Sequence, residues 1–105
     1  MIKLLYATFA SKDEAVLISH KLLSEKLIAC ANVIDGSTSV YNWNGETKEQ
    51  SEVILFAKTS DDVAEKAVSR IKELHSYDVP CVLILPIDSG FPPFMEWVKE
   101  QTINP

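Results

Sequence analysis

Apolar residues alternate or run together in four stretches of this chain, and each stretch is typical of a β-strand. The first stretch covers residues 2–9 and is apolar on both of its faces. The second and third cover residues 27–43 and 46–59, and they meet at Asn44-Gly45, a dipeptide that strongly favours a two-residue hairpin loop. The fourth covers residues 81–87. The pattern therefore predicts four strands, two of them joined in one long hairpin.

Between these strands, apolar residues recur every three or four positions, which is the period of an amphipathic helix. Ser11 and Glu14 have the spacing of a capping box, which predicts the start of a first helix. Ser60 is a good cap for a second helix, and Pro92-Pro93 suit the first turn of a short third one. The resulting order, βαββαβ with a helical tail, predicts a ferredoxin-like α+β sandwich with two helices on one face of an antiparallel sheet.

The long hairpin does not pair cleanly as a straight ladder. Straight pairing from the turn sets Asp35 opposite Ile54, on the face that Val33 and Phe56 share. A carboxylate does not belong among apolar side chains. Because a slip of one residue moves every side chain to the other face, one extra residue near Asp35-Gly36 restores the pattern. We predict a β-bulge there.

The hairpin is also longer than the body of a chain this size. Each arm of about 14 residues reaches about 46 Å, whereas a compact chain of this length forms a sphere about 33 Å across. Two helices cover only one sheet face, while residues 4–7 and 53–57 are apolar on both faces. An uncovered apolar face of this kind needs a partner, most simply a second copy of the chain.

Composition narrows the class of protein. With 47% apolar and 24% charged residues, the 105 residues suit one domain, 1–105, with one core. A net charge of −5 argues against a nucleic-acid surface. No stretch is long enough for a membrane span or a signal peptide, so we expect a cytoplasmic protein. Cys30 and Cys81 stand inside apolar runs, which favours two buried, unreactive thiols.

Six motifs stand in order along the chain: Leu27 to Val33 (LIACANV), Ser39 to Glu46 (SVYNWNGE), Glu52, Lys58-Thr59, His75 to Pro80 (HSYDVP) and Pro86. Together they resemble the CutA family, the divalent-cation tolerance proteins, over essentially the whole chain. The resemblance implies a homotrimer similar in architecture to the PII signalling proteins, with hairpins that span subunit boundaries. It also implies a non-enzymatic role in tolerance to copper and other divalent ions.

The resemblance further implies a functional cleft between subunits. Its expected lining residues are Cys30, Tyr41, Trp43, Lys58, His75 and Tyr77. No cofactor is obligatory, and copper or another divalent cation is the expected ligand. His75 and Cys30 are the candidate metal ligands, because copper accepts imidazole and, as Cu(I), thiolate. Neither belongs to a C-x-x-C or H-x-x-x-H pair.

Each candidate residue also has a simpler interpretation. His75 at a helix end can hydrogen-bond a free carbonyl. Tyr41 and Trp43 can pack across the hairpin or on a neighbouring subunit instead of stacking on a ligand. Lys58 can pair with Glu52 or a nearby aspartate, or it can meet an anion. A second function therefore stays open, a PII-like signalling or scaffold trimer that binds a small molecule or a protein, although the chain lacks a Gly-rich phosphate loop.

Overall fold

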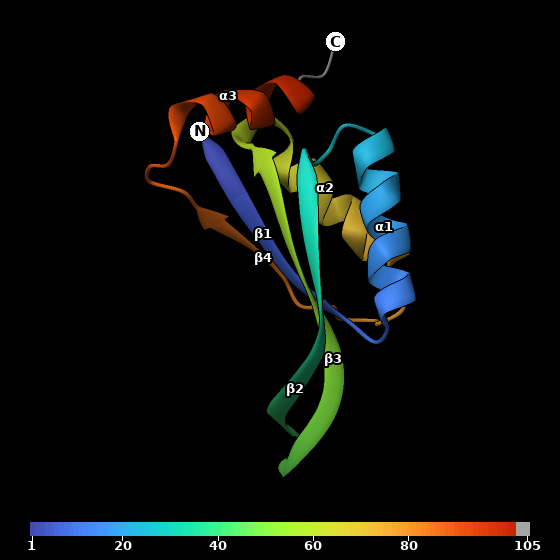
Figure 1. Ribbon diagram of the computed structural model, residues 1–105. Helices are drawn as coiled ribbons and strands as arrows, with labels where there is room; N and C mark the ends of the chain where they lie inside the picture. Colours follow the sequence, from blue (N-terminus) through green and yellow to red (C-terminus); the bar gives the residue numbers. More distant parts are fainter. Residues whose placement is uncertain (103–105) are drawn as a thin grey trace.

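Four strands and three helices make up residues 1–102, the part of the chain that this computed structural model describes (Figure 1). Their order is β1 (Ile2–Phe9), α1 (Lys12–Ser24), β2 (Cys30–Trp43), β3 (Glu46–Ser60), α2 (Asp61–Leu74), β4 (Val82–Pro86) and α3 (Pro92–Gln101). Helices α1 and α2 lie on one face of the sheet, and α3 crosses the end of the sheet near the N-terminus (Figure 1). The predicted ferredoxin-like α+β order with a helical tail is confirmed.

The sheet is antiparallel, with the strand order β2-β3-β1-β4. β1 pairs with β3 from Ile2, opposite Ser60, to Phe9, opposite Val53. Beyond Val53, β2 and β3 continue alone as a hairpin that extends away from the helices (Figure 1). The turn residues Asn44-Gly45 both have positive φ, 51° and 79°, as the predicted two-residue loop requires. The hairpin gives the molecule a long axis of 45 Å against 26 and 21 Å.

The predicted β-bulge is confirmed at Gly36. Ile34 lies opposite Ile54, but Ser37 lies opposite Glu52, so β2 holds one residue more than β3 between these two pairs. Gly36 has a φ of 85°, and its N–H donates to the carboxylate of the preceding residue at 2.8 Å. Glycine adopts this left-handed conformation without a steric cost. The extra residue moves every later side chain of β2 to the other face.

The sheet face beneath α1 and α2 carries the core. Its fully buried members include Leu5, Ala7 and Phe9 of β1, Leu55 and Ala57 of β3, Ala15, Ile18 and Leu22 of α1, and Ala67 and Ile71 of α2. The capping box at the start of α1 is only half formed. Ser11 accepts a bond from the Glu14 N–H at 3.2 Å, but the Glu14 carboxylate accepts bonds from the N–H and hydroxyl of Ser76 instead.

The opposite sheet face carries apolar side chains that neither α1 nor α2 covers. We call it the open face, and it comprises Leu4, Tyr6, Ile34, Ile54, Phe56, Leu83 and Leu85. Leu83 is 56% exposed and Leu85 is 40% exposed, and the rings of Tyr6 and Phe56 lie 5.5 Å apart at its centre. The open face is therefore the uncovered apolar face that the sequence predicts.

Among residues 1–102, no helix has both the length and the apolar character that crossing a bilayer requires.

Candidate functional site

The predicted site residues fall into three groups in the structure. They are Cys30 with Lys58 on the open face, Tyr41, Trp43 and Tyr77 around a pocket beside the hairpin, and His75 inside the core. The resemblance implied one cleft for all six residues. A single protomer brings only the second group together around a cavity.

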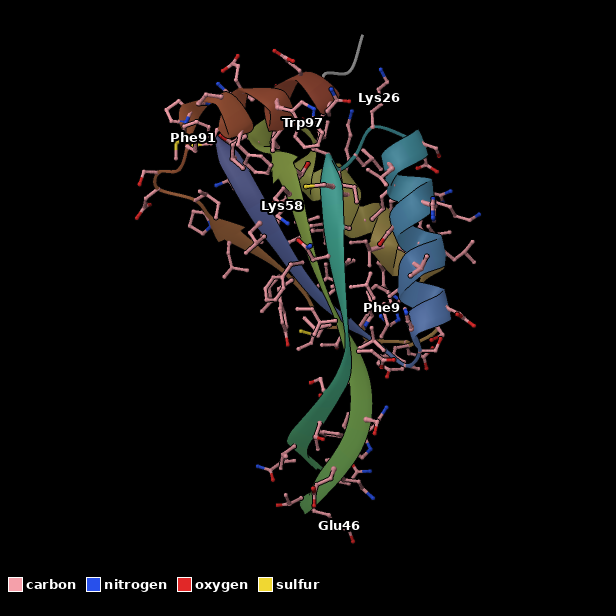
Figure 2. All side chains as sticks on the ribbon, viewed as in Figure 1. Phe9, Lys26, Glu46, Lys58, Phe91 and Trp97 are labelled. Carbon is pink, nitrogen blue, oxygen red and sulfur yellow. The ribbon has the colours of Figure 1, made fainter. Side chains whose placement is uncertain are left out.

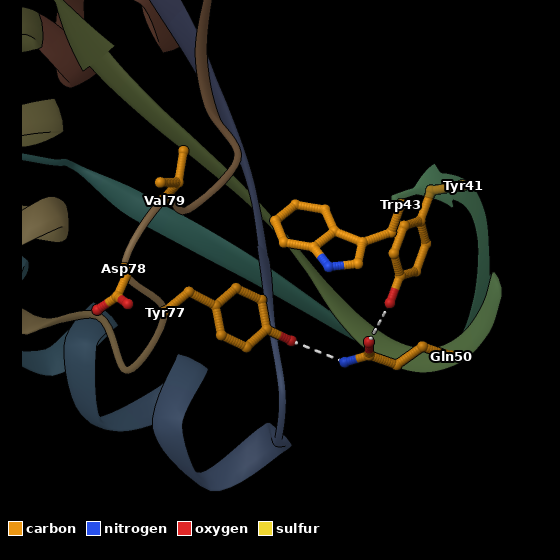
Figure 3. A pocket seen from close by; sticks show the side chains of 6 residues that line it. All are labelled: Tyr41, Trp43, Gln50, Tyr77, Asp78 and Val79. Carbon is orange, nitrogen blue, oxygen red and sulfur yellow. Dashed lines mark hydrogen bonds between the residues drawn. The ribbon is translucent and has the colours of Figure 1, made fainter. Parts of the chain in front are cut away.

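The pocket lies between the hairpin and the loop that follows α2 (Figure 3). Its volume is about 450 Å³, and its lining residues are Tyr41, Trp43, Gln50, Tyr77, Asp78 and Val79. Trp43 reaches from the hairpin towards the loop (Figure 3). Its side chain is 61% exposed and that of Val79 is 88% exposed, so the pocket presents apolar surface to water.

A chain of hydrogen bonds joins the two sides of this pocket. The Tyr41 hydroxyl donates to Gln50 Oε1 at 2.8 Å, and Gln50 Nε2 donates to the Tyr77 hydroxyl at 3.1 Å (Figure 3). The Tyr77 hydroxyl in turn donates to Glu52 Oε2 at 2.9 Å. Burial, together with the Glu52 carboxylate, raises the pKa of Tyr77 to about 12. Tyr77 therefore stays a protonated donor that ties the loop to the hairpin.

The β-bulge determines on which side this pocket forms. Before the bulge, Cys30 and Ile34 point to the open face. After it, Tyr41 and Trp43 do so, because Tyr41 pairs with Lys48 on the same side of β3 as Gln50. Without the extra residue, the two aromatic rings would point to the side of the helices. The pocket is thus a continuation of the open face along the hairpin.

His75 caps the C-terminus of α2, and its side chain is fully buried. Its Nδ1 accepts the Tyr77 N–H at 3.0 Å, so its Nε2 carries the proton and donates to the Thr8 carbonyl at 2.7 Å. The ring stacks on Phe9, with centroids 4.5 Å apart. The ring thus bonds a carbonyl, but one that belongs to β1 and not to the end of α2, where the simpler interpretation placed it. With both nitrogens engaged, metal binding would need one of these hydrogen bonds to break.

Lys58 lies on the open face opposite Cys30 (Figure 2). Its Nζ donates to Asn32 Oδ1, so of the two alternatives for Lys58 the pairing with Glu52 or an aspartate is not formed, and the contact with an anion stays a prediction. The reason is the register, because Asn32 is the next residue of β2 on the same face. An amide offers a hydrogen bond but no negative charge, so the ammonium keeps its charge uncompensated at this contact.

The prediction of two buried cysteines is also wrong. Cys30 is only half-buried, because it opens the edge strand β2 on the open face. Cys81 is exposed, because it lies in the loop just before the other edge strand, β4. Both are free thiols. Partial burial and the nearby Glu52 carboxylate raise the pKa of Cys81, which makes it a poor nucleophile at neutral pH.

The two candidate metal ligands lie apart in one protomer. Cys30 is level with Leu4 of β1, whereas His75 bonds Thr8, four residues further along the same strand, which is about 13 Å. Cys30 belongs to the open face, and His75 packs on Phe9 in the core beneath the helices. Within residues 1–102, no three His, Cys, Asp or Glu side chains gather where they could hold an ion.

Sequence reasoning missed three residues of the pocket, namely Gln50, Asp78 and Val79. Gln50 stands among polar residues of the hairpin, and no role was predicted for it. The pairing of the hairpin strands could have indicated the positions of Gln50 and Glu52. Straight pairing from the turn already places Gln50 and Glu52 on the same face as Tyr41 and Trp43, before the bulge is reached. The two loop residues, Asp78 and Val79, belong to the HSYDVP motif, of which only His75 and Tyr77 were predicted as site residues.

Comparison with known proteins places the chain in a family. The sequence model of the CutA1 divalent ion tolerance protein matches residues 3–101. The chain belongs to the CutA1 family. Among CutA1 relatives, the divalent-cation tolerance protein CutA of Thermus thermophilus is 37% identical, over 97% of this chain and 99% of its own length. The chloroplastic protein CutA of Arabidopsis thaliana is 35% identical over 94% of this chain, which spans only 54% of that relative.

A solved CutA1 structure shares the fold closely. The periplasmic divalent cation tolerance protein CutA of Archaeoglobus fulgidus superposes with a TM-score of 0.94 and 31% identity, covering 98% of this chain and 100% of that one. The names of the relatives include a chloroplastic and a periplasmic protein. The cytoplasmic location expected from the sequence therefore stays a prediction.

Proposed function

We propose that this chain forms a homotrimer that takes part in tolerance to divalent metal ions, copper foremost, without catalysing a reaction. The observation that carries the proposal is the open face, where apolar side chains such as Leu83 and Leu85 stand exposed in the protomer. Apolar patches of this kind mark interaction surfaces. Membership of the CutA1 family supports the role in tolerance.

The hairpin supports the same assembly. It extends beyond the helices along the 45 Å axis, and beyond Val53 its two strands pair only with each other. An isolated two-stranded ribbon is marginally stable in water, so contact with a neighbouring protomer would stabilise it. A closed ring of three copies buries each open face once and leaves none free.

Metal binding in this proposal occurs at the boundaries between protomers. Cys30 is the ligand that the geometry favours, because it is a half-buried free thiol on the open face and thus meets the next protomer. Thiolate is a ligand that Cu(I) prefers. His75 remains the second predicted ligand, and it would have to release either Thr8 or Tyr77 to bind.

Competition titration of the assembled protein with a copper chelator under reducing conditions tests this proposal. We expect one stoichiometric site per protomer or per trimer, and at least a tenfold loss of affinity in Cys30→Ala, since a soft ligand is removed. Cys81→Ala is the matched control and should bind as the wild type does. Titration curves unchanged by both Cys30→Ala and His75→Ala would reject these ligands.

The pocket favours a second candidate function, a PII-like signalling or scaffold trimer that binds a small molecule or a protein partner. Two of its three aromatic side chains, Tyr41 and Tyr77, are held in place by hydrogen bonds before any ligand arrives. A ligand of the native state raises the melting temperature by mass action. A thermal-shift screen of metabolites, with metal ions in parallel wells, compares the two functions. If only metal ions raise the melting temperature, the result would count against the signalling or scaffold function.

A further inference from the structure

The lining of the pocket beside the hairpin selects for one kind of charge. Three aromatic rings, one aliphatic side chain and one amide surround the cavity. Asp78 is the only charged residue in this lining, and it is acidic. Two lysines next to lining residues have partners outside the cavity, Lys72 the Asp78 carbonyl at 2.7 Å and Lys48, which pairs with Tyr41 across the hairpin, Glu46 at 3.3 Å. An anionic ligand would therefore find no cationic partner in the lining.

Aromatic rings attract a cation through their faces, and the indole of tryptophan does so best. Here the hydroxyls of Tyr41 and Tyr77 are both bonded to the Gln50 amide, which uses the oxygen and the nitrogen of that amide. These hydroxyls already have hydrogen-bond partners within the protein. A ligand would therefore contact the apolar faces of the rings. We propose that the pocket binds an organic cation, an alkylated ammonium group, between Tyr41, Trp43 and Tyr77.

Two further features support a cationic ligand. The Tyr77 hydroxyl is bonded to the Glu52 carboxylate, which places a second negative charge at the edge of that ring. The chain as a whole carries a net charge of −5. The carboxylates of Glu52 and Asp78 and the negative net charge of the chain attract cations and repel nucleotides and other anions. The volume of about 450 Å³ lies within the range of small-molecule sites and accommodates a trimethylammonium group with a short substituent.

The arrangement is also ordered before the ligand binds. Gln50 of β3 is held between Tyr41 of β2 and Tyr77 of the loop, which joins segments 27 residues apart in the sequence. The rings of Tyr41 and Tyr77, which are already fixed by these bonds, lose little conformational freedom on binding, so more of their contact energy appears as affinity. This site requires no metal ion, and the proposal therefore goes beyond metal tolerance and stands independently of it.

The test uses choline as the probe, on the intact, assembled protein. Binding is followed by broadening of the trimethylammonium proton signal of choline. It is also followed by Trp43 fluorescence in a Trp97→Phe background, where Trp43 is the only indole. We expect saturable binding of choline, and binding about tenfold weaker for its neutral isostere 3,3-dimethylbutan-1-ol, which has the same shape without the charge.

Two variants and one matched control locate the site. We expect Trp43→Leu to lower choline affinity about tenfold, because it removes the strongest ring, and Asp78→Asn to lower it about threefold. Phe94→Leu removes an exposed aromatic ring on α3, at the far end of the molecule from the hairpin, and should change nothing (Figure 1). Circular dichroism and light scattering confirm that each variant is folded and assembled.

Three results would overturn the proposal. One is equal affinity for choline and its neutral isostere, and another is the absence of saturable binding of choline at millimolar concentrations. The third is unchanged choline affinity in both Trp43→Leu and Asp78→Asn. Asp78 is exposed, and its side chain has no role in the fold described above, so Asp78→Asn decides the test even where Trp43→Leu disturbs assembly. Copper titration of the same samples separates failure of this site from failure of metal binding.

Discussion

At the scale of single residues, Tyr77 joins the core to the pocket. Its backbone N–H donates to the buried ring of His75, while its hydroxyl reaches Gln50 and Glu52 of the hairpin. The two rings also pack together, with centroids 4.8 Å apart. The position of the pocket wall therefore depends on a histidine that itself never lines the pocket.

The raised pKa of Tyr77 predicts a change in stability at high pH. An unfolded tyrosine loses its proton near pH 10, whereas Tyr77 keeps it until about pH 12. The contribution of this group to stability is thus complete below about pH 10 and is lost as the pH rises through this window. We expect the highest step of the phenolate absorbance titration to disappear in Tyr77→Phe. Its persistence would assign that step to Tyr6 or Tyr41.

His75→Ala should destabilise the fold whether or not a metal binds there. The substitution removes two buried hydrogen bonds and a ring stacked on Phe9, so we expect the free energy of unfolding to fall by about 3 kcal/mol. Urea unfolding at fixed protein concentration, without metal, measures the loss. His20→Ala, an exposed histidine on α1, is the matched control and should stay within about 0.5 kcal/mol of the wild type. Equal effects of the two substitutions would contradict the structure.

At the scale of elements, local patterns predicted the strands, the helices and even the bulge, because the mismatch of Asp35 depends only on pairing from a known turn. Side-chain partners were harder to predict because they come from distant segments. Glu14 has the correct spacing to bond back to Ser11, yet it bonds Ser76, 62 residues away. The pocket was only half predicted for the same reason. Its aromatic residues belong to a recognisable motif, but Gln50 acquires its role only when the loop packs against the hairpin.

Gly36 allows a direct test of the bulge. Nothing lies within 4 Å of a Cβ built at this position, so Gly36→Ala introduces no clash. Its φ of 85° alone should cost about 1 kcal/mol of unfolding free energy, because L-residues avoid this region. Ser37→Ala, at the next position, is the control and should change stability far less in the same urea titration. An unaffected Gly36→Ala variant would show that the bulge relaxes easily.

At the scale of the whole molecule, the open face and the pocket form one continuous surface. Ile54 and Phe56 belong to the sheet, and Gln50 and Glu52 continue the same side of β3 into the hairpin. The proposed assembly through the open face would therefore bring a neighbouring protomer close to the pocket. A ligand of the pocket and the contact between protomers should influence each other for this reason.

Leu83→Asp tests whether the open face is an assembly surface. Leu83 is 56% exposed in the protomer, so a carboxylate there is tolerated by the isolated fold, but it would lose hydration between protomers. We expect light scattering at micromolar concentrations to show a trimer for the wild type and a monomer for Leu83→Asp. Leu17→Asp, at a leucine that is 59% exposed on α1, is the matched control and should remain a trimer. A monomeric wild type would contradict the assembly itself.

The single extra residue at Gly36 also limits how the length of the hairpin can change. Adding two residues to each arm between Gly36 and Tyr41 would carry the aromatic pair about 7 Å outwards and leave it on the same face. Adding one residue to each arm would turn Tyr41 and Trp43 away from it. The reach of the hairpin and the chemistry of its surface are therefore independent variables, provided that each arm grows or shrinks by an even number of residues.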